Sequence, residues 1–404
     1  MTKPKKRRLR KEFQFILPLC MMVLGYFMIK TFSFSEPVEY TKVEHEGQKL
    51  EYKALYRTET ITETATMYIT GDALVQMECI DQARTGEDSY DWSYLMDGTA
   101  NMAADYDIAF YNQETILGGD YLGITSFPHF NCPQSFGDYM VSKGFNLVST
   151  ANNHSLDKDE EGIENSQEFW KAQSGVVTSG LNSSRDEREA VEIHEVNGIT
   201  YAFTAWTYAM NGYETSRGHE YMVNCYRGHE QEMLEWVSRA KEKADIVIVS
   251  MHWGEEYTDE PDEEQLQLAK QLSDAGADII IGNHPHNIQP VEWINDRTIC
   301  FYSMGNLVNS QDVLPATTWE EVNTGMAATL LIEKTIDVDD TVKIAIKDVK
   351  TDLLFTSYTG DFENIHSVFY KDIDPEVFPD KDSFYQKMAD DVIRRYDSSI
   401  TVGF

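Results

Sequence analysis

Basic residues are scarce in this 404-residue sequence, which has 34 Lys and Arg against 68 Asp and Glu and a formal net charge of −34. Seven of the cations fall within residues 1–11, so the remainder carries −41. A body this acidic repels polyanions at long range, which excludes nucleic acid as a partner. The charge alone is typical of a soluble or salt-tolerant protein. Any anionic substrate would need a local cationic centre, for which a pair of metal ions is the obvious source.

Cysteine is also rare, with five residues and no C-x-x-C spacing, which argues against a zinc knot. Beyond Cys20, the residues Cys79, Cys132, Cys225 and Cys300 could form two disulfides in an oxidising exterior. Cys300 lies in an apolar run, where a free buried thiol is the more typical state. The sequence leaves the pairing open.

Only one long apolar run occurs, residues 13–29, and it follows the basic flank of residues 1–11. Its 17 residues are at the short end of the roughly 17 to 25 that cross a bilayer. The basic flank is typical of the cytoplasmic side. A cleaved signal peptide is the alternative, but no small-x-small site follows the run. We therefore predict a single-pass protein of the cell membrane with a cytoplasmic segment 1–12, a transmembrane helix 13–30 and an extracellular main domain.

The rest of the chain contains no repeat or low-complexity tract. Residues 31–64 are polar and weakly patterned, which suits a stalk. A main domain is predicted over residues 65–358. Residues 359–404 are interpreted as a C-terminal appendage with a helix near Ser383–Tyr396.

Six short apolar runs share one pattern, because each ends abruptly at a turn that carries a polar side chain. Runs of this kind are typical of strands buried on both faces of a parallel sheet, whose ends form ligand sites. If the strands are parallel, their polar side chains are delivered to one sheet edge. The runs, each with the polar residues that follow it, are 66–70 with Asp72, 107–111 with Glu114, 146–150 with Asn153 and His154, 245–251 with His252, 277–281 with His284 and His286, and 298–303 with Asn306.

The segments between these runs indicate an α/β fold. Asp262–Ala275 has acidic residues at its start, an apolar stripe and Gly276 after it, which predicts a helix. This helix would join two parallel strands in a βαβ crossover. A second helix is predicted near His229–Lys243, and antiparallel hairpins around Asn197-Gly198 and Asp339-Asp340. The predicted fold is a layered sandwich with central, mostly parallel strands, antiparallel hairpins and helices outside.

The polar residues after the runs suit one or two divalent metal ions of the Mn, Fe or Zn class. Taken singly, each histidine is more typical of a satisfied loop residue, but their combination with acidic residues at matching positions favours a metal site. A metal pair needs several nitrogen and oxygen donors around centres roughly 3.5 to 4 Å apart. The candidate ligands are Asp72, Glu114, Asn153, His252, His284 and His286.

His154, next to Asn153, is the candidate for proton transfer, with Asp157 as the carboxylate that supports it. The alternative for this stretch is a capped turn that opens a helix. Trp253, Glu256 and Asn306 are candidate substrate-binding residues. An aromatic residue after a buried strand is, however, more often part of the packing.

Several of these stretches occur together in one known family. The sequence resembles the CapA (PgsA) family of capsule and poly-γ-glutamate synthesis proteins, whose domain resembles the calcineurin-like metallophosphoesterases. The resemblance covers about residues 65–308 and the hairpin that follows. It rests on GD at 71–72, N-x-E-T at 112–115, ANNHSLD at 151–157, NGITYAF at 197–203, HWG-x-EY at 252–257, AGADIIIG-x-HPH-x-x-QP at 275–290 and YSMGN at 302–306.

The resemblance implies that the six candidate ligands are metal-binding positions and that His154 is the proton donor beside them. Two departures stand out. Leu74 occupies the position of the histidine in the usual D-x-H motif, which removes one ligand or makes the site asymmetric. Asn283 stands where related sequences often have another histidine. One metal ion, or a weakly held second, therefore fits the sequence.

Three functions from different classes remain open. The first is a membrane-anchored, metal-dependent hydrolase that cleaves a phosphoester, or an amide bond of a polymer, with His154 protonating the leaving group. The second is a non-catalytic accessory subunit that binds or exports an anionic polymer together with other membrane subunits of a polymer synthase. The third is an α/β binding module without metal, which leaves the clustered acidic residues and histidines unexplained.

Overall fold

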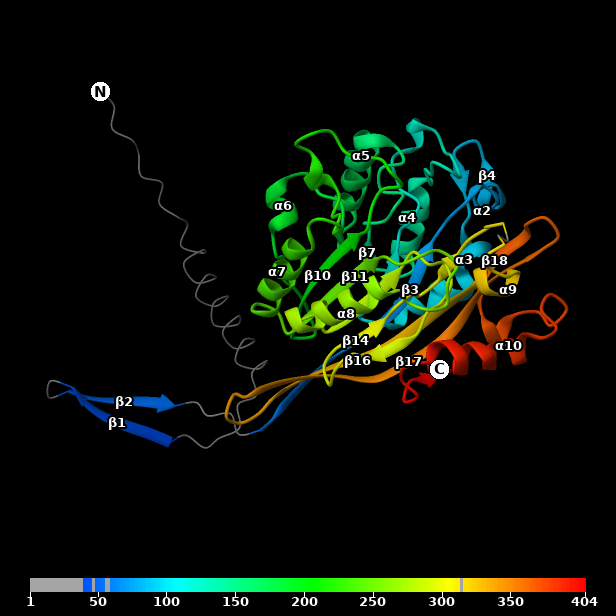
Figure 1. Cartoon of the computed structure of the whole chain (residues 1–404). Coiled ribbons are helices and arrows are strands. Elements are labelled where there is room, and N and C mark those ends of the chain that lie inside the picture. The colour runs from blue at the N-terminus through cyan, green and yellow to red at the C-terminus, as the bar shows by residue number, and fades with distance from the viewer. Residues whose placement is uncertain (1–38, 46–47, 55–58, 313–314) are drawn as a thin grey trace, which may run out of the picture. The chain divides into compact units, whose positions relative to one another are not determined.

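The computed structural model describes residues 39–45, 48–54, 59–312 and 315–404 (Figure 1). The predicted cytoplasmic segment 1–12 and transmembrane helix 13–30 lie outside these residues. Within the described ranges, no helix is both long and apolar enough to cross a membrane. The chain divides into two compact units, residues 1–61 with 336–342, and residues 62–335 with 343–404.

The smaller unit contains an antiparallel pair, β1 (Glu39–His45) and β2 (Gln48–Ala54), with Val43 opposite Leu50. Both strands fall within the stretch predicted as a stalk. That stretch therefore contains a two-stranded sheet, which its weak pattern did not indicate.

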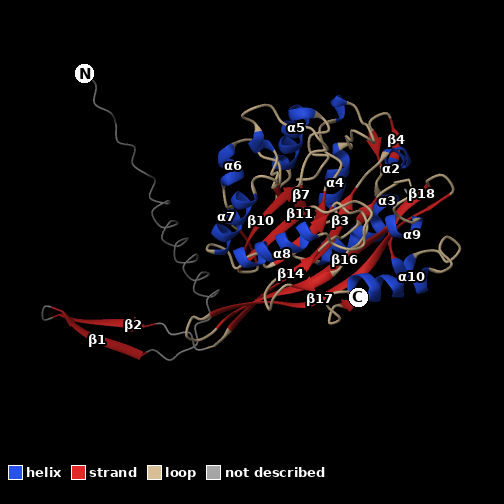
Figure 2. Ribbon diagram, in the orientation of Figure 1, coloured by secondary structure: helices blue, strands red, loops and turns tan. Residues whose placement is uncertain are grey.

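The larger unit is built on two sheets, whose strands are red in Figure 2. The first sheet has six strands, of which four adjacent ones, β10, β11, β12 and β14, run parallel. The edge strands β9 and β13 pair antiparallel with their neighbours. The order across the sheet is β13 (Val291–Trp293), β14 (Ile299–Phe301), β12 (Ile279–Asn283), β11 (Ile246–His252), β10 (Ile199–Thr207) and β9 (His194–Val196).

The second sheet has nine strands and also contains four adjacent parallel ones, β3, β6, β7 and β8. Two short strands complete it, with β15 (Asn306–Val308) beside β3 and β19 (Thr401–Val402) beside β17. The order is β18 (Glu363–Phe369), β17 (Val342–Thr359), β16 (Thr324–Ile336), β3 (Ile61–Ala73), β6 (Ile108–Asn112), β7 (Leu147–Ser149) and β8 (Val177–Ser179).

The two sheets pack face to face. Side chains from both, such as Phe110 and Phe203 with ring centroids 6.1 Å apart, share one buried core. Successive strand residues point to opposite faces, so Ile246 and Ile248 enter this inner core whereas Val247 packs with the outer helices. The result is the predicted layered α/β arrangement of helices, sheet, sheet and helices.

Helices cover the outer faces of both sheets (Figure 2). The first sheet is covered by α7 (Glu230–Lys241) and α8 (Glu263–Ala275). The second is covered by α2 (Met77–Ala83), α3 (Ser93–Ala100), α4 (Gln134–Ser142) and part of α5 (Asp159–Ala172). Shorter elements are β4 (Arg84–Gly86), β5 (Ser89–Tyr90), α6 (Arg185–Glu189) and α9 (Trp319–Val322).

The predicted βαβ crossover is confirmed, because α8 connects the parallel strands β11 and β12. Asp262 caps α8 in a capping box with Gln265, and Gly276 follows the helix with φ 120°. The predicted hairpin between β9 and β10 is also confirmed. Its turn residues Asn197 and Gly198 both have positive φ, as a type I′ turn requires.

Residues 359–404 do not form the separate appendage that we predicted. β18 pairs with β17, and α10 (Lys381–Lys387) leads into a π-helical segment, η5 (Met388–Ile393). Val392 and Ile400 belong to the same core as the two sheets. The boundary after residue 358 was wrong because β17 runs from Val342 to Thr359 and pairs with β18, which brings the following residues into the sheet.

Candidate metal centre

The candidate ligands come from strands of both sheets rather than from one sheet edge. Asp72 is the next-to-last residue of β3 and Glu114 follows β6 in the second sheet, whereas His252 ends β11 in the first. All are buried, and the ligand atoms within each of two groups lie within 4.8 Å of one another. The groups are Asp72, Glu114 and His286, and Glu114, His252 and His284. Glu114 is common to both.

Glu114 is fully buried, and neither of its carboxylate oxygens has a hydrogen-bond partner in the described part of the chain. The nearest imidazole nitrogens are His252 Nε2 at 3.7 Å and His286 Nε2 at 3.8 Å, both from Oε1. Burial raises the Glu114 pKa well above its usual range, and the nearby Asp72 carboxylate raises it further. An ionised carboxylate in this position needs a cation to compensate for the lost hydration.

Asp72 is held rigidly by two hydrogen bonds. Its Oδ1 accepts from Asn112 Nδ2 at 2.8 Å, and its Oδ2 accepts from the backbone N–H of His284 at 3.0 Å. Burial raises the Asp72 pKa, although both hydrogen bonds act in the opposite direction. Asn112 is the first residue of the N-x-E-T motif and was not among the predicted site residues. The structure shows that it orients a candidate ligand.

Burial keeps the three histidines neutral, which is the form of imidazole that binds metal. It lowers the pKa of His252 and His284 well below the usual value, and that of His286 to about 4. Asn153 Oδ1 lies 3.0 Å from His252 Nε2, so these two predicted ligand atoms are adjacent. His284 Nδ1 is buried without a hydrogen-bond partner in the described residues.

His284 and His286 lie beyond the end of β12, and the turn rather than strand alternation brings them together. Both have left-handed backbone, with φ 97° and 60°, and their ring centroids are 6.2 Å apart. Residues with side chains seldom adopt this conformation, and such strain is concentrated at functional sites. The structure thus brings together the two histidines that were predicted as ligands, through the conformation of the turn and not through the alternation of a strand.

Asn306 positions His286 instead of lining the pocket as a substrate-binding residue. His286 Nδ1–H donates to Asn306 Oδ1 at 3.0 Å, which leaves Nε2 free as a ligand. Asn306 Nδ2 donates to Gln311 Oε1 and to the Val322 carbonyl, which fixes the direction of the amide. Close backbone contact holds this loop against β3, because a Cβ on Gly71 would lie 1.9 Å from the Gly305 carbonyl oxygen.

His154 and Asp157 form a pair beside the candidate ligands. His154 Nδ1 lies 2.8 Å from Asp157 Oδ2, which also accepts from the backbone N–H of Phe130. The Phe130 ring packs edge-on to His154 with centroids 4.6 Å apart. If Nδ1 donates to Asp157, then Nε2 is the nitrogen available to a substrate. The alternative interpretation also holds locally, because Asn152 and Ser155 form a hydrogen-bonded turn before α5.

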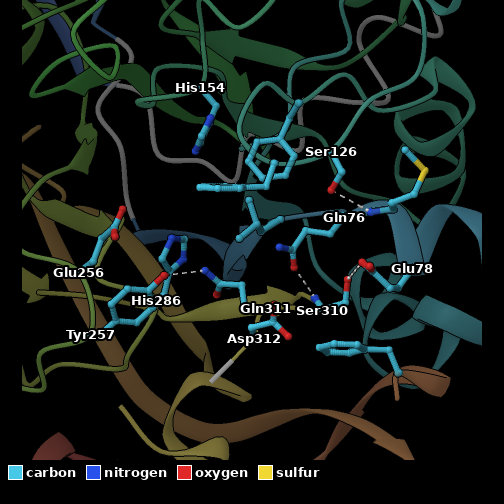
Figure 3. A pocket seen from close by; sticks show the side chains of 15 residues that line it. Gln76, Glu78, Ser126, His154, Glu256, Tyr257, His286, Ser310, Gln311 and Asp312 are labelled. Atoms are coloured by element: carbon cyan, nitrogen blue, oxygen red, sulfur yellow. Dashed lines mark hydrogen bonds between the residues drawn. The ribbon is translucent and has the colours of Figure 1, made fainter. Parts of the chain in front are cut away.

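A cavity of about 390 Å³ adjoins this centre and is lined by His154, Glu256, Tyr257 and His286, among others (Figure 3). The Glu256 side chain is exposed, but nearby residues of the cavity wall displace part of the water around its carboxylate. This loss of hydration raises the Glu256 pKa. Trp253, predicted to bind substrate, does not line the cavity. It is fully buried in the core beneath the outer helices, and its indole N–H donates to the Tyr302 carbonyl.

The sequence profile of the family described as "Bacterial capsule synthesis protein PGA_cap" matches residues 66–311. The chain belongs to this family. The match includes every candidate ligand, the His154–Asp157 pair and Asn306. It confirms the resemblance that the motifs indicated.

Two curated relatives in the PGA_cap family share more than a third of the aligned residues. The "PGA biosynthesis protein CapA" of Bacillus subtilis is 37% identical over 169 residues, which cover 41% of this chain and 43% of the relative. The "Capsule biosynthesis protein CapA" of Bacillus anthracis is 35% identical over 188 residues, which cover 45% and 44%. The chain thus spans less than half the length of each relative.

Solved structures offer weaker similarities. GAP50, "the anchor in the inner membrane complex of Plasmodium", matches 71% of this chain and 90% of its own at 10% identity and a TM-score of 0.38. The purple acid phosphatase PPD1 from yellow lupin matches 75% and 56% at 12% identity and a TM-score of 0.32. At such scores these similarities support no conclusion about this chain.

The two departures from the family pattern occupy different surroundings. Leu74 is buried and lines the cavity, so an apolar side chain stands where a further histidine ligand was expected. Asn283 Nδ2 donates to Ser250 Oγ at 3.2 Å within the first sheet. This PGA_cap member therefore offers fewer donors around Asp72 than around His252, where Asn153 is added.

Replacing Glu114 with Gln should separate a cation-binding role from a structural one. Because the Glu114 pKa is raised in the folded state, its ionisation destabilises the metal-free protein as pH rises above the usual pKa of about 4.3. We expect Glu114→Gln in chelator to be more stable than the parent protein above about pH 5, by an amount that grows with pH. Urea unfolding from pH 5 to 8 measures this.

The same variant should bind divalent metal at least about tenfold more weakly, as measured by calorimetry, because one donor is lost from both groups. Glu255→Gln, a change at an exposed neighbour of the pocket, is the control. Lower stability of Glu114→Gln than of the parent at every pH would contradict the assignment.

Replacing Asn306 with Ala should release His286 from its fixed tautomer and weaken metal binding by about 10- to 100-fold. Asn309→Ala is a matched control, because Asn309 is equally buried in the same loop and bonds Val322 but touches no candidate ligand. Equal losses of metal affinity in both variants would show that the loop matters only for folding.

Proposed function

We propose that this PGA_cap family member is a metal-dependent hydrolase of the phosphoesterase type that acts in capsule or PGA biosynthesis. The observation that carries the proposal is the fully buried carboxylate of Glu114, which has no hydrogen-bond partner within the described ranges of the chain. It belongs to both donor groups and lies within reach of two imidazoles. The neighbouring cavity, with a histidine and carboxylate pair on its wall, supplies space for a substrate.

The donor atoms suit one or two divalent ions of the Mn, Fe or Zn class, because they are carboxylate oxygens, imidazole nitrogens and an amide oxygen. The buried atoms without partners, on Glu114 and His284, are those that a cation would satisfy. An ion held there would supply Lewis-acid polarisation of a phosphoryl or carbonyl oxygen. One set would be Asp72, Glu114 and His286, and the other Glu114, Asn153, His252 and His284.

The chain itself supplies the proton. In hydrolysis, the oxygen of water bonds to phosphorus and that water releases one proton to solvent, while the ester P–O bond breaks and the departing oxygen takes a proton. His154 would give that proton from Nε2, because its Nδ1 is bonded to Asp157. Asp157 stabilises the doubly protonated ring and holds its orientation, helped by the hydrogen bond from the Phe130 backbone. The same groups would serve for an amide bond of the PGA polymer.

A second function, a non-catalytic accessory subunit of a polymer synthase, is favoured by one observation. Leu74 stands where a histidine ligand was expected, so the Asp72 group has one donor fewer. An ion at this group would be held more weakly, and its contribution to catalysis would be smaller. Such a protein would bind an anionic polymer and work with other membrane subunits. Metal binding without turnover of any ester or polymer would favour this function over hydrolysis.

His252→Ala and His286→Ala should each lose bound metal and at least 100-fold in turnover of bis(p-nitrophenyl) phosphate, because each removes a buried ligand. His154→Ala should keep the metal and lose turnover alone. Elemental analysis and a colorimetric assay measure the two effects. His219→Ala, at an exposed histidine paired with Glu160, is the control. Full turnover in His286→Ala would eliminate the proposed hydrolase.

We further propose that residues 13–30 anchor the chain in the cell membrane with the main domain outside. The basic flank and the apolar run support this. The full chain should remain in the membrane fraction after a high-salt wash and be cut by protease added to intact cells. A chain starting at residue 31 should leave that fraction. Retention of the shorter chain would show that another part of the protein holds it there.

A further inference from the structure

The cavity beside the candidate metal centre is acidic on its wall. Glu78, Glu256 and Asp312 line it, and no Lys or Arg is among its described lining residues. Glu78 Oε2 accepts a hydrogen bond from Ser310 Oγ at 3.0 Å. The carboxylates of Glu256 and Asp312 make no hydrogen bond or ion pair within the described part of the chain. As far as the structure describes the wall, it therefore carries three carboxylates and neither Lys nor Arg.

Aromatic rings share this wall with the carboxylates. Phe127, Phe130, Tyr257 and Phe362 line the cavity. Phe127 is 77% exposed although it packs against Phe130 with ring centroids 6.5 Å apart. Large apolar rings left open to solvent at a cavity offer faces on which a ligand can lie, and the faces of aromatic rings attract cations.

The cavity also contains groups that identify it as the place where a substrate meets the centre. His154 lines the cavity and is only 7% exposed. Its Nδ1 lies within hydrogen-bond distance of the Asp157 carboxylate. Figure 3 shows the His154 ring hanging into this space opposite Tyr257 and His286. The metal centre would take the anionic end of a substrate. The part beyond it would face the carboxylates and rings.

A polyanion has the wrong charge for that outer part. A chain of glutamate residues carries a carboxylate on every residue, and each would approach a wall that is already negative. An ammonium group fits both features at once, since carboxylates attract its charge and aromatic faces attract cations. A substrate of this kind carries opposite charges at its two ends, with a negative phosphate at one end and a positive ammonium group at the other.

We propose that this pocket binds the ammonium-bearing part of a phosphoester substrate. The alcohol of this ester would carry a primary amine or a quaternary ammonium group. A segment of an anionic polymer would not bind there. This assignment rests on the proposed hydrolase. Glu78, Glu256 and Asp312 are the residues that would select the charge. The ester could be a small soluble molecule or a lipid headgroup, because both carry the same chemistry.

The test compares two chromogenic diesters with the same leaving group, p-nitrophenyl phosphorylcholine and bis(p-nitrophenyl) phosphate. We expect the metal-loaded full chain to prefer the choline ester by at least about tenfold in kcat/KM, and the preference to shrink as salt is raised. In the variant Glu78→Gln, Glu256→Gln, Asp312→Asn, the ratio of the two kcat/KM values should fall at least about tenfold, through KM of the choline ester.

The control variant carries the same change of charge at exposed positions outside the cavity, Glu235→Gln, Glu242→Gln and Asp296→Asn, and should keep the preference. Release of phosphorylcholine from phosphatidylcholine vesicles would assign the pocket to a lipid headgroup, and turnover of the soluble ester alone to a small molecule. An unchanged ratio in the pocket variant, or no preference in the parent protein, would overturn the proposal.

Failure of the hydrolase and failure of this assignment give different results. If the metal-loaded protein cleaves no ester, the proposed function falls, and the pocket is tested by calorimetry with phosphorylcholine and glycerol 2-phosphate. Tighter binding of phosphorylcholine that is lost in the pocket variant supports the ammonium site. Equal binding of the two phosphates overturns it.

Discussion

The structure depends on how a fully buried carboxylate is accommodated. Among the described residues, neither oxygen of Glu114 has a hydrogen-bond partner, whereas the polar side chains around it make several hydrogen bonds. Asp72 is held by Asn112 and the His284 backbone, and His286 is held by Asn306. A protein interior seldom leaves such a group unpaired while satisfying its neighbours. The pattern is that of ligands oriented for an ion, with Glu114 shared between two donor groups.

Two sheets, rather than one, create the place for that ion. Asp72 and Glu114 lie at or just beyond the ends of strands of one sheet, and the three histidines at or just beyond the ends of strands of the other. The segment from β14 to β15 passes between the sheets and brings Asn306 beside Asp72. Its close approach to β3 requires glycine at position 71. The centre therefore lies where this segment connects the two sheets, and the positions of its ligands depend on how the sheets pack together.

Much of the fold could be predicted from the sequence because its signals are local. Apolar runs of strand length, the capped α8 and the Asn197-Gly198 turn each specify their own structure. Which runs share a sheet is not local, since it depends on packing between distant segments. For that reason the expectation of one sheet edge was wrong, although the side chains still meet. The long extension of β17 was missed for the same reason, and with it the place of residues 359–404.

The site residues that could be identified from the sequence are likewise those with a local signal. Side chains with distinctive chemistry at strand ends, such as Glu114 and His252, could be identified from the pattern alone. Asn306 was predicted to bind substrate, but its contact with His286 was not predicted, because that contact depends on a loop whose path the sequence does not reveal. Trp253 was placed in the pocket, whereas its side chain turned out to belong to the core beneath α8.

The left-handed backbone of His284 and His286 bears on the free energy with which an ion could be held. Pro285 between them restricts the turn further, so both imidazoles are set in position before any ion arrives. Little conformational entropy then remains to be lost when the ion enters from this side. An ion that enters this centre would therefore lose less binding free energy to the ordering of these two side chains than it would in a flexible loop.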